Sequence, residues 1–234
     1  MNYLNLNKIA LSENFYRFVA SAALHMLTKY MVGGIKINIQ NMDLPIQVGL
    51  SSSACISVLV VRSFNKIYNL GLSKKQEMEA AYKSEFYTGS RCGKLDQLVA
   101  LNKSALLAKF NKKSITIKDI KIRNDLDIIV VKFNGNKKNT IKILKDLSSA
   151  FPFPKNHQSK LAFNALGKDN QLIVNKAMDY LATGNNKQIG RLMNKAQSIF
   201  DKKLAPLSPQ QLTAPTFHRF INDKIIKKNI HGAK

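Results

Sequence analysis

The segment Ser52–Tyr68 constrains the fold most, because it is apolar on nearly every side. A helix that is hydrophobic all round has to be buried among other elements. Apolar residues recur at steps of three and four in Ser12–Tyr30, which predicts an amphipathic helix with Ser12 as its N-cap. A further helix is expected from a cap at Ser73 to about Phe86. The chain is therefore predicted to fold around a buried central helix.

Short runs of β-forming residues accompany these helices. In Gly34–Gln40 isoleucines alternate with polar residues, which is the period of a half-buried strand. Further strands are expected at Ala105–Phe110, Ser114–Lys118 and Asp127–Phe133, and helices at Thr140–Ala150, Asp169–Thr183, Asn185–Asp201 and Phe217–Lys228. The predicted fold class is α+β. Gly, Asn and Lys cluster near residues 134–138, so we expect two domains, residues 1–135 and 136–234.

The balance of charge weakens one class of function. Among 234 residues, 37 Lys and Arg face 14 Asp and Glu, a formal net charge of +23. Most of the basic residues are lysines spread from Lys8 to Lys234 without interleaved aromatic residues, whereas sequence-specific nucleic-acid readers favour arginine. We therefore expect no specific nucleic-acid partner. Cys55 and Cys92 give neither a disulfide framework nor metal-ligand spacing, and no apolar run is long enough to span a membrane, so a cytoplasmic location is expected.

A small-residue loop precedes the central helix. The residues from Pro45 to Ala54 read Pro-Ile-Gln-Val-Gly-Leu-Ser-Ser-Ser-Ala and join a strand to the helix N-terminus. Backbone N–H groups and the positive end of the helix dipole converge there, and Gly49 lets the backbone approach a ligand closely. Serine hydroxyls can donate to phosphate oxygens or bind Mg²⁺, although the Walker A ending is absent. Local chemistry alone supports a plain serine N-cap equally well.

A second polar segment holds two carboxylates on either side of a glycine-rich turn. It begins with Glu85 at a probable helix end and reaches Asp96. An isolated Asp in a loop is usually a cap or turn residue. Here Arg91 and Lys94 could hold Asp96 ionised as a base toward a substrate hydroxyl, while Glu85 could hold a metal that bridges nucleotide phosphates.

Together the two segments resemble the GHMP kinase superfamily, the group that contains galactokinase, homoserine kinase, mevalonate kinase and phosphomevalonate kinase. The first looks like that family's Pro-x-x-x-Gly-Leu-Ser/Gly-Ser-Ser-Ala phosphate loop. The second is similar to the Cys-Gly-x-Met-Asp-Gln stretch of galactokinase-like members, with Leu95 where Met is usual. Both motifs occur in the family's order, and the triple serine favours the sugar-kinase side.

The resemblance implies ATP-dependent phosphorylation of a small sugar or alcohol, with ATP and Mg²⁺ as cofactors. The phosphate-binding residues it implies are Gly49, Leu50, Ser51, Ser52, Ser53 and Ala54. It assigns Mg²⁺ to Ser53 and Glu85 and the role of base to Asp96. It also implies an N-terminal part like domain 2 of ribosomal protein S5 and a ferredoxin-like C-terminal part.

Two departures from the family pattern shape the expected activity. No Gly-Arg-x-Asn-Leu-like motif precedes Leu11, and His231–Lys234 looks like the opening of the family's third motif. We therefore expect a truncated central part of a longer kinase, with both fold parts incomplete and with weak or no turnover. A catalytically inactive nucleotide-binding remnant is the alternative, and a basic RNA-associated protein is the weaker one.

Overall fold

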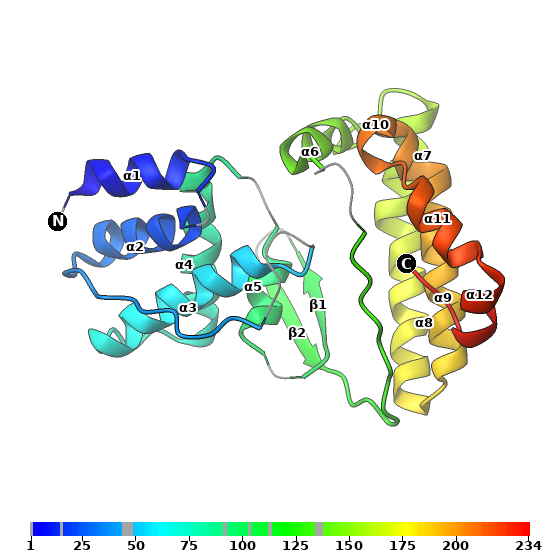
Figure 1. Ribbon diagram of the computed structural model, residues 1–234, viewed down its shortest axis with the longest axis horizontal. Helices are drawn as coiled ribbons and strands as arrows, with labels where there is room; N and C mark the ends of the chain where they lie inside the picture. The colour runs from blue at the N-terminus through cyan, green and yellow to red at the C-terminus, as the bar shows by residue number, and fades with distance from the viewer. Residues whose placement is uncertain are drawn as a thin grey trace. The chain divides into compact units, whose positions relative to one another are not determined.

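The chain folds into two compact units, Met1–Ile117 and Lys118–Lys234, in a computed structural model (Figure 1). The structure describes residues 2–14, 16–43, 49–90, 93–102, 104–111, 114–133 and 138–234. The division lies before the expected boundary near residues 134–138, of which 134–137 are outside the described residues. The assignment of residues 1–135 and 136–234 to two kinase domains stays a prediction.

The first unit is built mainly from helices. These are α1 (Tyr3–Leu11), α2 (Arg17–Tyr30), α3 (Ser52–Ile67), α4 (Lys74–Glu85), the 3₁₀ turn η1 (Phe86–Thr88) and α5 (Leu95–Ala100). The central position expected for α3 is confirmed, since it packs against α2, α4 and α5. The helix expected over Ser12–Tyr30 is confirmed from Arg17 to Tyr30, but its expected start with Ser12 as N-cap is wrong. Ser12 instead ends α1, and its backbone N–H donates to the Ile9 carbonyl at 3.1 Å.

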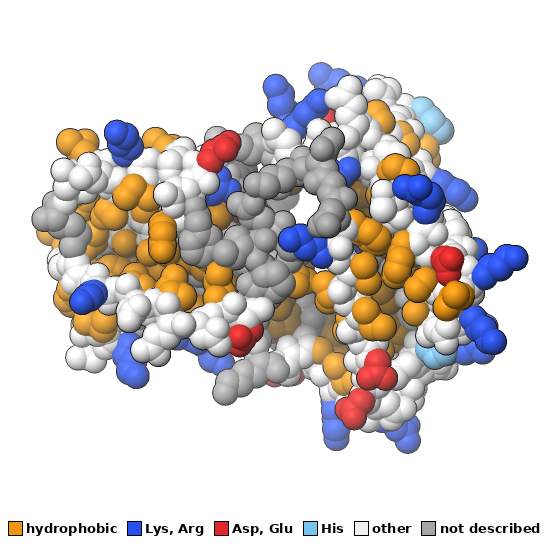
Figure 2. All heavy atoms as spheres, in the orientation of Figure 1, with side chains coloured by type: hydrophobic (Ala, Val, Ile, Leu, Met, Phe, Trp, Pro, Cys, Tyr) orange, Lys and Arg blue, Asp and Glu red, His pale blue; other side chains and the backbone are white. Residues whose placement is uncertain are grey.

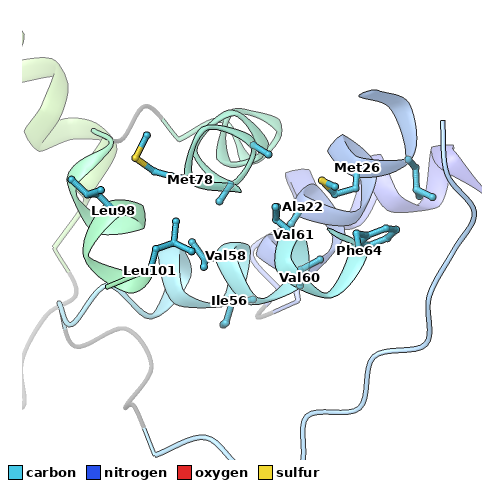
Figure 3. Close-up of a cluster of buried hydrophobic side chains, with 13 residues drawn as sticks. Ala22, Met26, Ile56, Val58, Val60, Val61, Phe64, Met78, Leu98 and Leu101 are labelled. Atoms are coloured by element: carbon cyan, nitrogen blue, oxygen red, sulfur yellow. The ribbon is translucent and has the colours of Figure 1, made fainter. Parts of the chain in front are cut away.

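Buried apolar side chains from four helices meet around α3 (Figure 3). They are Ala22, Met26 and Leu27 of α2, Ile56, Val58, Val60, Val61 and Phe64 of α3, Met78, Ala80 and Ala81 of α4, and Leu98 and Leu101 in and after α5. Val61 is fully buried and Phe64 retains 1% of its exposure. The core thus follows from the all-round apolar character of α3. Among the described residues, no helix is both long enough and apolar enough to cross a membrane.

A partly buried ion pair fixes the register between α3 and α4. The Arg62 guanidinium donates to Glu77 through Nε (3.1 Å) and Nη2 (3.0 Å), and Asn65 Nδ2 donates to the other Glu77 oxygen at 2.8 Å. The short connection between the helices makes them antiparallel neighbours. Glu85 lies about two helical turns after Glu77 in α4. Because the two helices are antiparallel, the same level of α3 lies about two turns before Arg62, which is the first turn of α3. The register therefore brings the C-terminal end of α4 level with the N-terminal end of α3.

Two of the expected strands form a small sheet. β1 (Leu106–Phe110) and β2 (Ile115–Asp119) pair as a two-stranded sheet, which confirms these two predictions. Gly34–Gln40 and Asp127–Phe133 are not strands, so those predictions are wrong. Both segments have the side-chain pattern of strands, but a strand also needs a neighbouring strand for its backbone groups, and among the described residues neither segment is paired with one. The architecture is thus mostly helical with a small sheet, less β-rich than expected.

The second unit is helical beyond the end of β2. It contains α6 (Thr140–Ser148), α7 (His157–Asn164), α8 (Asn170–Thr183), α9 (Asn186–Ile199), α10 (Pro209–Leu212), α11 (Pro215–Asn222) and α12 (Lys224–Asn229), with π-helical turns at Ala165–Asp169 and Phe200–Leu204 and a 3₁₀ turn at Ala205–Leu207. A small core holds Ala150, Ala162, Ala165 and Leu204. The S5-like and ferredoxin-like parts stay predictions.

Two boundaries in the second unit differ from expectation because of capping side chains. The single helix expected over Phe217–Lys228 is two helices, since the Asp223 carboxylate accepts from the N–H groups of Ile225 (2.8 Å) and Ile226 (3.1 Å) and starts α12. Helix α7 was not expected from the sequence. It begins with a capping box between Asn156 and Ser159, a signal that the sequence does carry.

Basic side chains do not form a stripe on the face shown in Figure 2. Lys and Arg are scattered around the outline there, with apolar and uncharged polar side chains between them. This distribution agrees with the spread of lysines along the whole sequence. It gives no support to a nucleic-acid groove on that face.

Candidate functional site

The loop before α3 turns through two residues with left-handed backbone. Gly49 has φ +80°, and Ser51 has φ 56° and ψ 33°. A Cβ placed on Gly49 would meet no atom within 4 Å, so the glycine is required by its backbone conformation and not by close packing. Left-handed backbone is uncommon for serine, and such strain is frequently found at ligand sites. Leu50, between them, is half-buried.

Ser51 occupies the N-cap position of α3 without acting as an ordinary cap. Its side chain makes no capping hydrogen bond within the described residues. Ser73 shows the ordinary geometry one helix later, with extended backbone (φ −66°, ψ 161°) and its Oγ accepting from the Gln76 N–H. The first helical hydrogen bond of α3 runs from the Cys55 N–H to the Ser51 carbonyl at 3.2 Å. The plain N-cap interpretation of this loop is therefore wrong for Ser51.

The backbone around Ser51 has the form of an anion-binding concavity. A left-handed residue followed by right-handed helical residues aims successive N–H groups to one side. The N–H groups of Ser52, Ser53 and Ala54 belong to the first helical turn, where intrahelical acceptors are lacking and the helix dipole is positive. Ser52 and Ser53 are half-buried, while Ala54 retains 1% exposure. This end of α3 can hold a phosphate group.

Opposite changes at the two left-handed positions should have opposite effects on stability. Gly49→Ala is expected to lower the free energy of unfolding by about 1 kcal/mol, because the Cβ of alanine is strained in left-handed backbone. Ser51→Gly is expected to raise it by a few tenths to about 1 kcal/mol, because glycine relieves that strain. Urea denaturation of both variants checks this. A loss of stability in Ser51→Gly would show that the serine is not strained.

Glu85 is a buried carboxylate tied to α5. Its side chain retains 3% exposure, and its Oε1 accepts from Gln97 Nε2 at 2.7 Å, with Gln97 fully buried. Ser57 of α3 is also fully buried, and its Oγ has no hydrogen-bond partner in the part of the chain that the structure describes. By the helix register these polar groups lie toward the N-terminal end of α3. A buried carboxyl group at this end of an otherwise apolar core indicates a role other than packing.

Asp96 lies exposed in the first turn of α5, next to the same end of α3. Burial and then repulsion from the Asp96 carboxylate raise the pKa of the Cys55 thiol. A carboxylate acts on a thiol in this way only when the two are close, and Cys55 directly follows Ala54. Helices α3 and α5 pack together through Val58, Leu98 and Leu101 (Figure 3). Asp96 and the serine loop therefore lie in one neighbourhood.

The expected partner of Asp96 is engaged elsewhere. Lys94 Nζ contacts the two Glu79 oxygens at 2.8 and 3.0 Å and lies 4.8 Å from the centre of the Tyr82 ring. The expectation that Lys94 holds Asp96 ionised is therefore wrong. Arg91, the other expected partner, lies outside the described residues.

The donor set at this end of α3 fits Mg²⁺. That ion takes oxygen ligands and is usually held by one or two carboxylates together with phosphates and water. The Ser53 hydroxyl and the Glu85 carboxylate supply such oxygens. Among the described residues, no three His, Cys, Asp or Glu side chains form a cage for a metal.

Comparison with known proteins identifies the family of this region. Residues 17–104 match the model of the GHMP kinases N terminal domain. These residues are therefore similar to the N-terminal domain of the GHMP kinase superfamily. The superfamily match runs from the start of α2 to beyond α5, so it includes the serine loop, Glu85 and Asp96.

Two curated galactokinases of the superfamily are similar to the chain. That of Pyrococcus furiosus is 32% identical over 103 residues, which are 43% of this chain and 29% of the relative. That of Thermococcus kodakarensis is 28% identical over 147 residues, which are 62% of this chain and 39% of the relative. The chain thus spans less than half the length of these relatives.

The proximity of Asp96 to Cys55 can be measured through thiol reactivity. Asp96→Asn is expected to lower the pKa of the Cys55 thiol, because it removes a negative charge that opposes the thiolate. Iodoacetamide should then alkylate Cys55 faster at pH 8, since the thiolate is the nucleophile. Peptide mass mapping separates Cys55 from Cys92, whose rate serves as the reference. An unchanged Cys55 rate would place Asp96 away from the first turn of α3.

Two contacts that support the candidate site were not predicted from the sequence. Gln97 directly follows Asp96, and its side chain donates a hydrogen bond to the Glu85 carboxylate. The sequence does contain an indication of this contact, because Gln97 is a polar residue within an apolar helix and directly follows the expected base, Asp96. The pairing of Lys94 with Glu79 joins positions 15 apart in sequence, and no local pattern marks it.

Proposed function

We propose that the end of α3 is the site of ATP-dependent phosphorylation of a small sugar or alcohol. The observation that carries the proposal is the left-handed Ser51 at the N-terminus of α3, whose side chain makes no capping hydrogen bond among the described residues. Asp96 supports it, because its carboxylate raises the pKa of the Cys55 thiol in the first turn of the same helix. N–H groups and hydroxyls of residues 49–54 would bind the nucleotide phosphates, and Ser53 and Glu85 would hold Mg²⁺. When bound, the metal neutralises charge on the transferring phosphate.

The residues of the chain would act by positioning and proton transfer. Phosphoryl transfer depends almost wholly on alignment and on stabilisation of charge. Gln97 holds the Glu85 carboxylate in one orientation through its 2.7 Å hydrogen bond. Asp96 would accept the proton of the acceptor hydroxyl. The two similar galactokinases favour a sugar as acceptor, with galactose the first to test.

Weak turnover is part of the proposal. Asp96 is exposed to solvent. Lys94 forms an ion pair with Glu79, so its positive charge is not available to Asp96. Catalytic carboxylates work best where water is excluded and the charged groups are fixed. The same observations favour a second candidate, a site that binds nucleotide without turnover. A cytoplasmic location, in which ATP and Mg²⁺ are at hand, belongs to the proposal.

Nucleotide binding by paired serine variants tests the proposal. Titration with Mg²⁺ and ATP, followed by calorimetry, is expected to show one site. Ser53→Ala should weaken it about tenfold, as expected for loss of a hydrogen bond to a charged group. Ser63→Ala is the matched control, because Ser63 lies in the same helix and its Oγ donates to the Leu59 carbonyl. Its affinity should stay within about twofold of the unmodified chain.

Turnover decides between the two candidates. ATP consumption is measured with galactose, other sugars, polyols and mevalonate. Acceptor-dependent consumption supports the kinase, and binding without consumption supports the inactive nucleotide-binding site. Absence of ATP binding, or equal weakening in Ser53→Ala and Ser63→Ala, would remove both.

A further inference from the structure

The second unit contains a polar cavity of ≈ 550 Å³. It lies among α9, the turn that follows α9, α11, α12 and the segment Ile230–Ala233. Its charged or titratable lining residues are Asp201, Lys202, His218, Lys227 and His231. The volume is within the range of small-molecule sites. The cavity belongs to the second unit alone and does not involve the α3 loop of the first.

Close backbone packing builds one wall of this cavity. Gly190 of α9 and Gly232 approach so closely that a Cβ on Gly232 would collide with the Gly190 carbonyl, and a Cβ on Gly190 with the backbone of His231. The Ala233 N–H donates to Asn194 Oδ1 at 3.0 Å and fixes the same segment. The wall that carries His231 is therefore held in place against α9.

A histidine–aspartate pair joins two further walls. His218 Nε2 of α11 lies 3.3 Å from Asp201 Oδ1, and Gln197 Nε2 of α9 donates to the same oxygen at 2.8 Å. The His218 and Asp201 side chains are 35% and 32% exposed, so they are partly shielded and still reachable from the cavity. These contacts fix the polar groups on both sides before any ligand binds.

The balance of charge around the cavity favours an anion. Among the described residues that line the cavity, Asp201 is the one with an acidic side chain, and it is paired with His218. Lys202 and Lys227 add two cations, in a chain whose net charge is +23. Amides of Asn194 and Asn222 and the Ser198 hydroxyl offer hydrogen bonds suited to hydroxyl groups.

We propose that this cavity binds a small phosphorylated compound. Lys202 and Lys227 bind the phosphate, and the amide and hydroxyl groups bind the remainder of the molecule. Lysine serves as a point charge toward phosphate, so the two cations give affinity, and the fixed polar groups give selectivity. The site is separate from the proposed kinase site and does not depend on it.

Calorimetric titration at fixed ionic strength tests the proposal, first with inorganic phosphate and then with a hexose phosphate. Lys227→Gln should weaken phosphate binding about tenfold through loss of a charge-assisted hydrogen bond. Lys228→Gln is the matched control, since Lys228 is an exposed neighbour in α12 that does not line the cavity. It should change affinity less than about twofold. The hexose phosphate should bind more tightly than phosphate alone.

A spectroscopic readout locates the site independently of these variants. Phosphate should shift the imidazole NMR signals of His218 and His231 and leave those of His25, in the first unit, unchanged. Equal weakening by Lys227→Gln and Lys228→Gln would indicate non-specific attraction to a basic surface and overturn the proposal. So would unshifted His218 signals, or no saturation below about 10 mM. Because Ser53 lies outside this unit, Ser53→Ala should leave the shifts intact.

Discussion

Replacement of Asp96 with Asn is expected to abolish measurable phosphoryl transfer and to leave nucleotide binding intact. The carboxamide has nearly the same shape as the carboxylate but cannot accept the proton of an acceptor hydroxyl. Loss of a positioned general base typically lowers rates by about 10²- to 10⁴-fold. ATP affinity should stay within about twofold, because Asp96 is exposed and is not one of the phosphate-binding groups. Acceptor-dependent ATP consumption at high protein concentration measures the effect.

The control for Asp96→Asn is Asp127→Asn. Asp127 is likewise exposed and lies in the second unit, so its replacement changes net charge equally without touching the α3 site. Equal activity in Asp96→Asn and in the unmodified chain would remove Asp96 from the mechanism. Robust turnover by the unmodified chain, lost in Asp96→Asn, would confirm the base and contradict the proposed weak turnover.

The sequence predicted the helices whose formation is decided locally. Helix α3 was evident from its apolar character and α4 from the Ser73 cap, because each signal lies within or next to the helix it describes. Gly34–Gln40 and Asp127–Phe133 failed as strands because strand formation is decided by a partner distant in sequence. Ile129 retains 80% exposure in one such segment, so side-chain pattern alone did not secure burial.

The sequence motifs indicate candidate site residues, which stay a prediction, but they do not indicate the geometry of those residues. Motif order pointed to the serine loop, Glu85 and Asp96. The left-handed backbone of Ser51 could not be read from three consecutive serines, because a serine at an N-cap is ordinarily extended. The Gln97 contact to Glu85 and the Lys94 contact to Glu79 depend on how α4 and α5 pack. These contacts decide which charges are available for chemistry.

Phe64→Ala is expected to cause the largest loss of stability. Phe64 belongs to the main core, retains 1% exposure and stacks on Tyr68, with ring centroids 6.1 Å apart. Truncation removes buried apolar surface and leaves a cavity that the surrounding helices fill incompletely, at a cost of about 3–5 kcal/mol. The Tyr68 hydroxyl donates to the Gly34 carbonyl at 2.9 Å, so the packing of residues 31–43 should also loosen. Urea denaturation followed by circular dichroism measures the change.

Leu59→Ala in the same helix separates core packing from helix propensity. Leu59 is 61% exposed, so its replacement should cost about 0.5 kcal/mol or less. A comparable loss in both variants would mean that Phe64 is not packed as described. The Arg62–Glu77 register and the Ser51 geometry both depend on α3 staying in place. ATP affinity in Phe64→Ala should therefore decline in step with the folded fraction of the first unit, whereas phosphate binding in the second unit should not change.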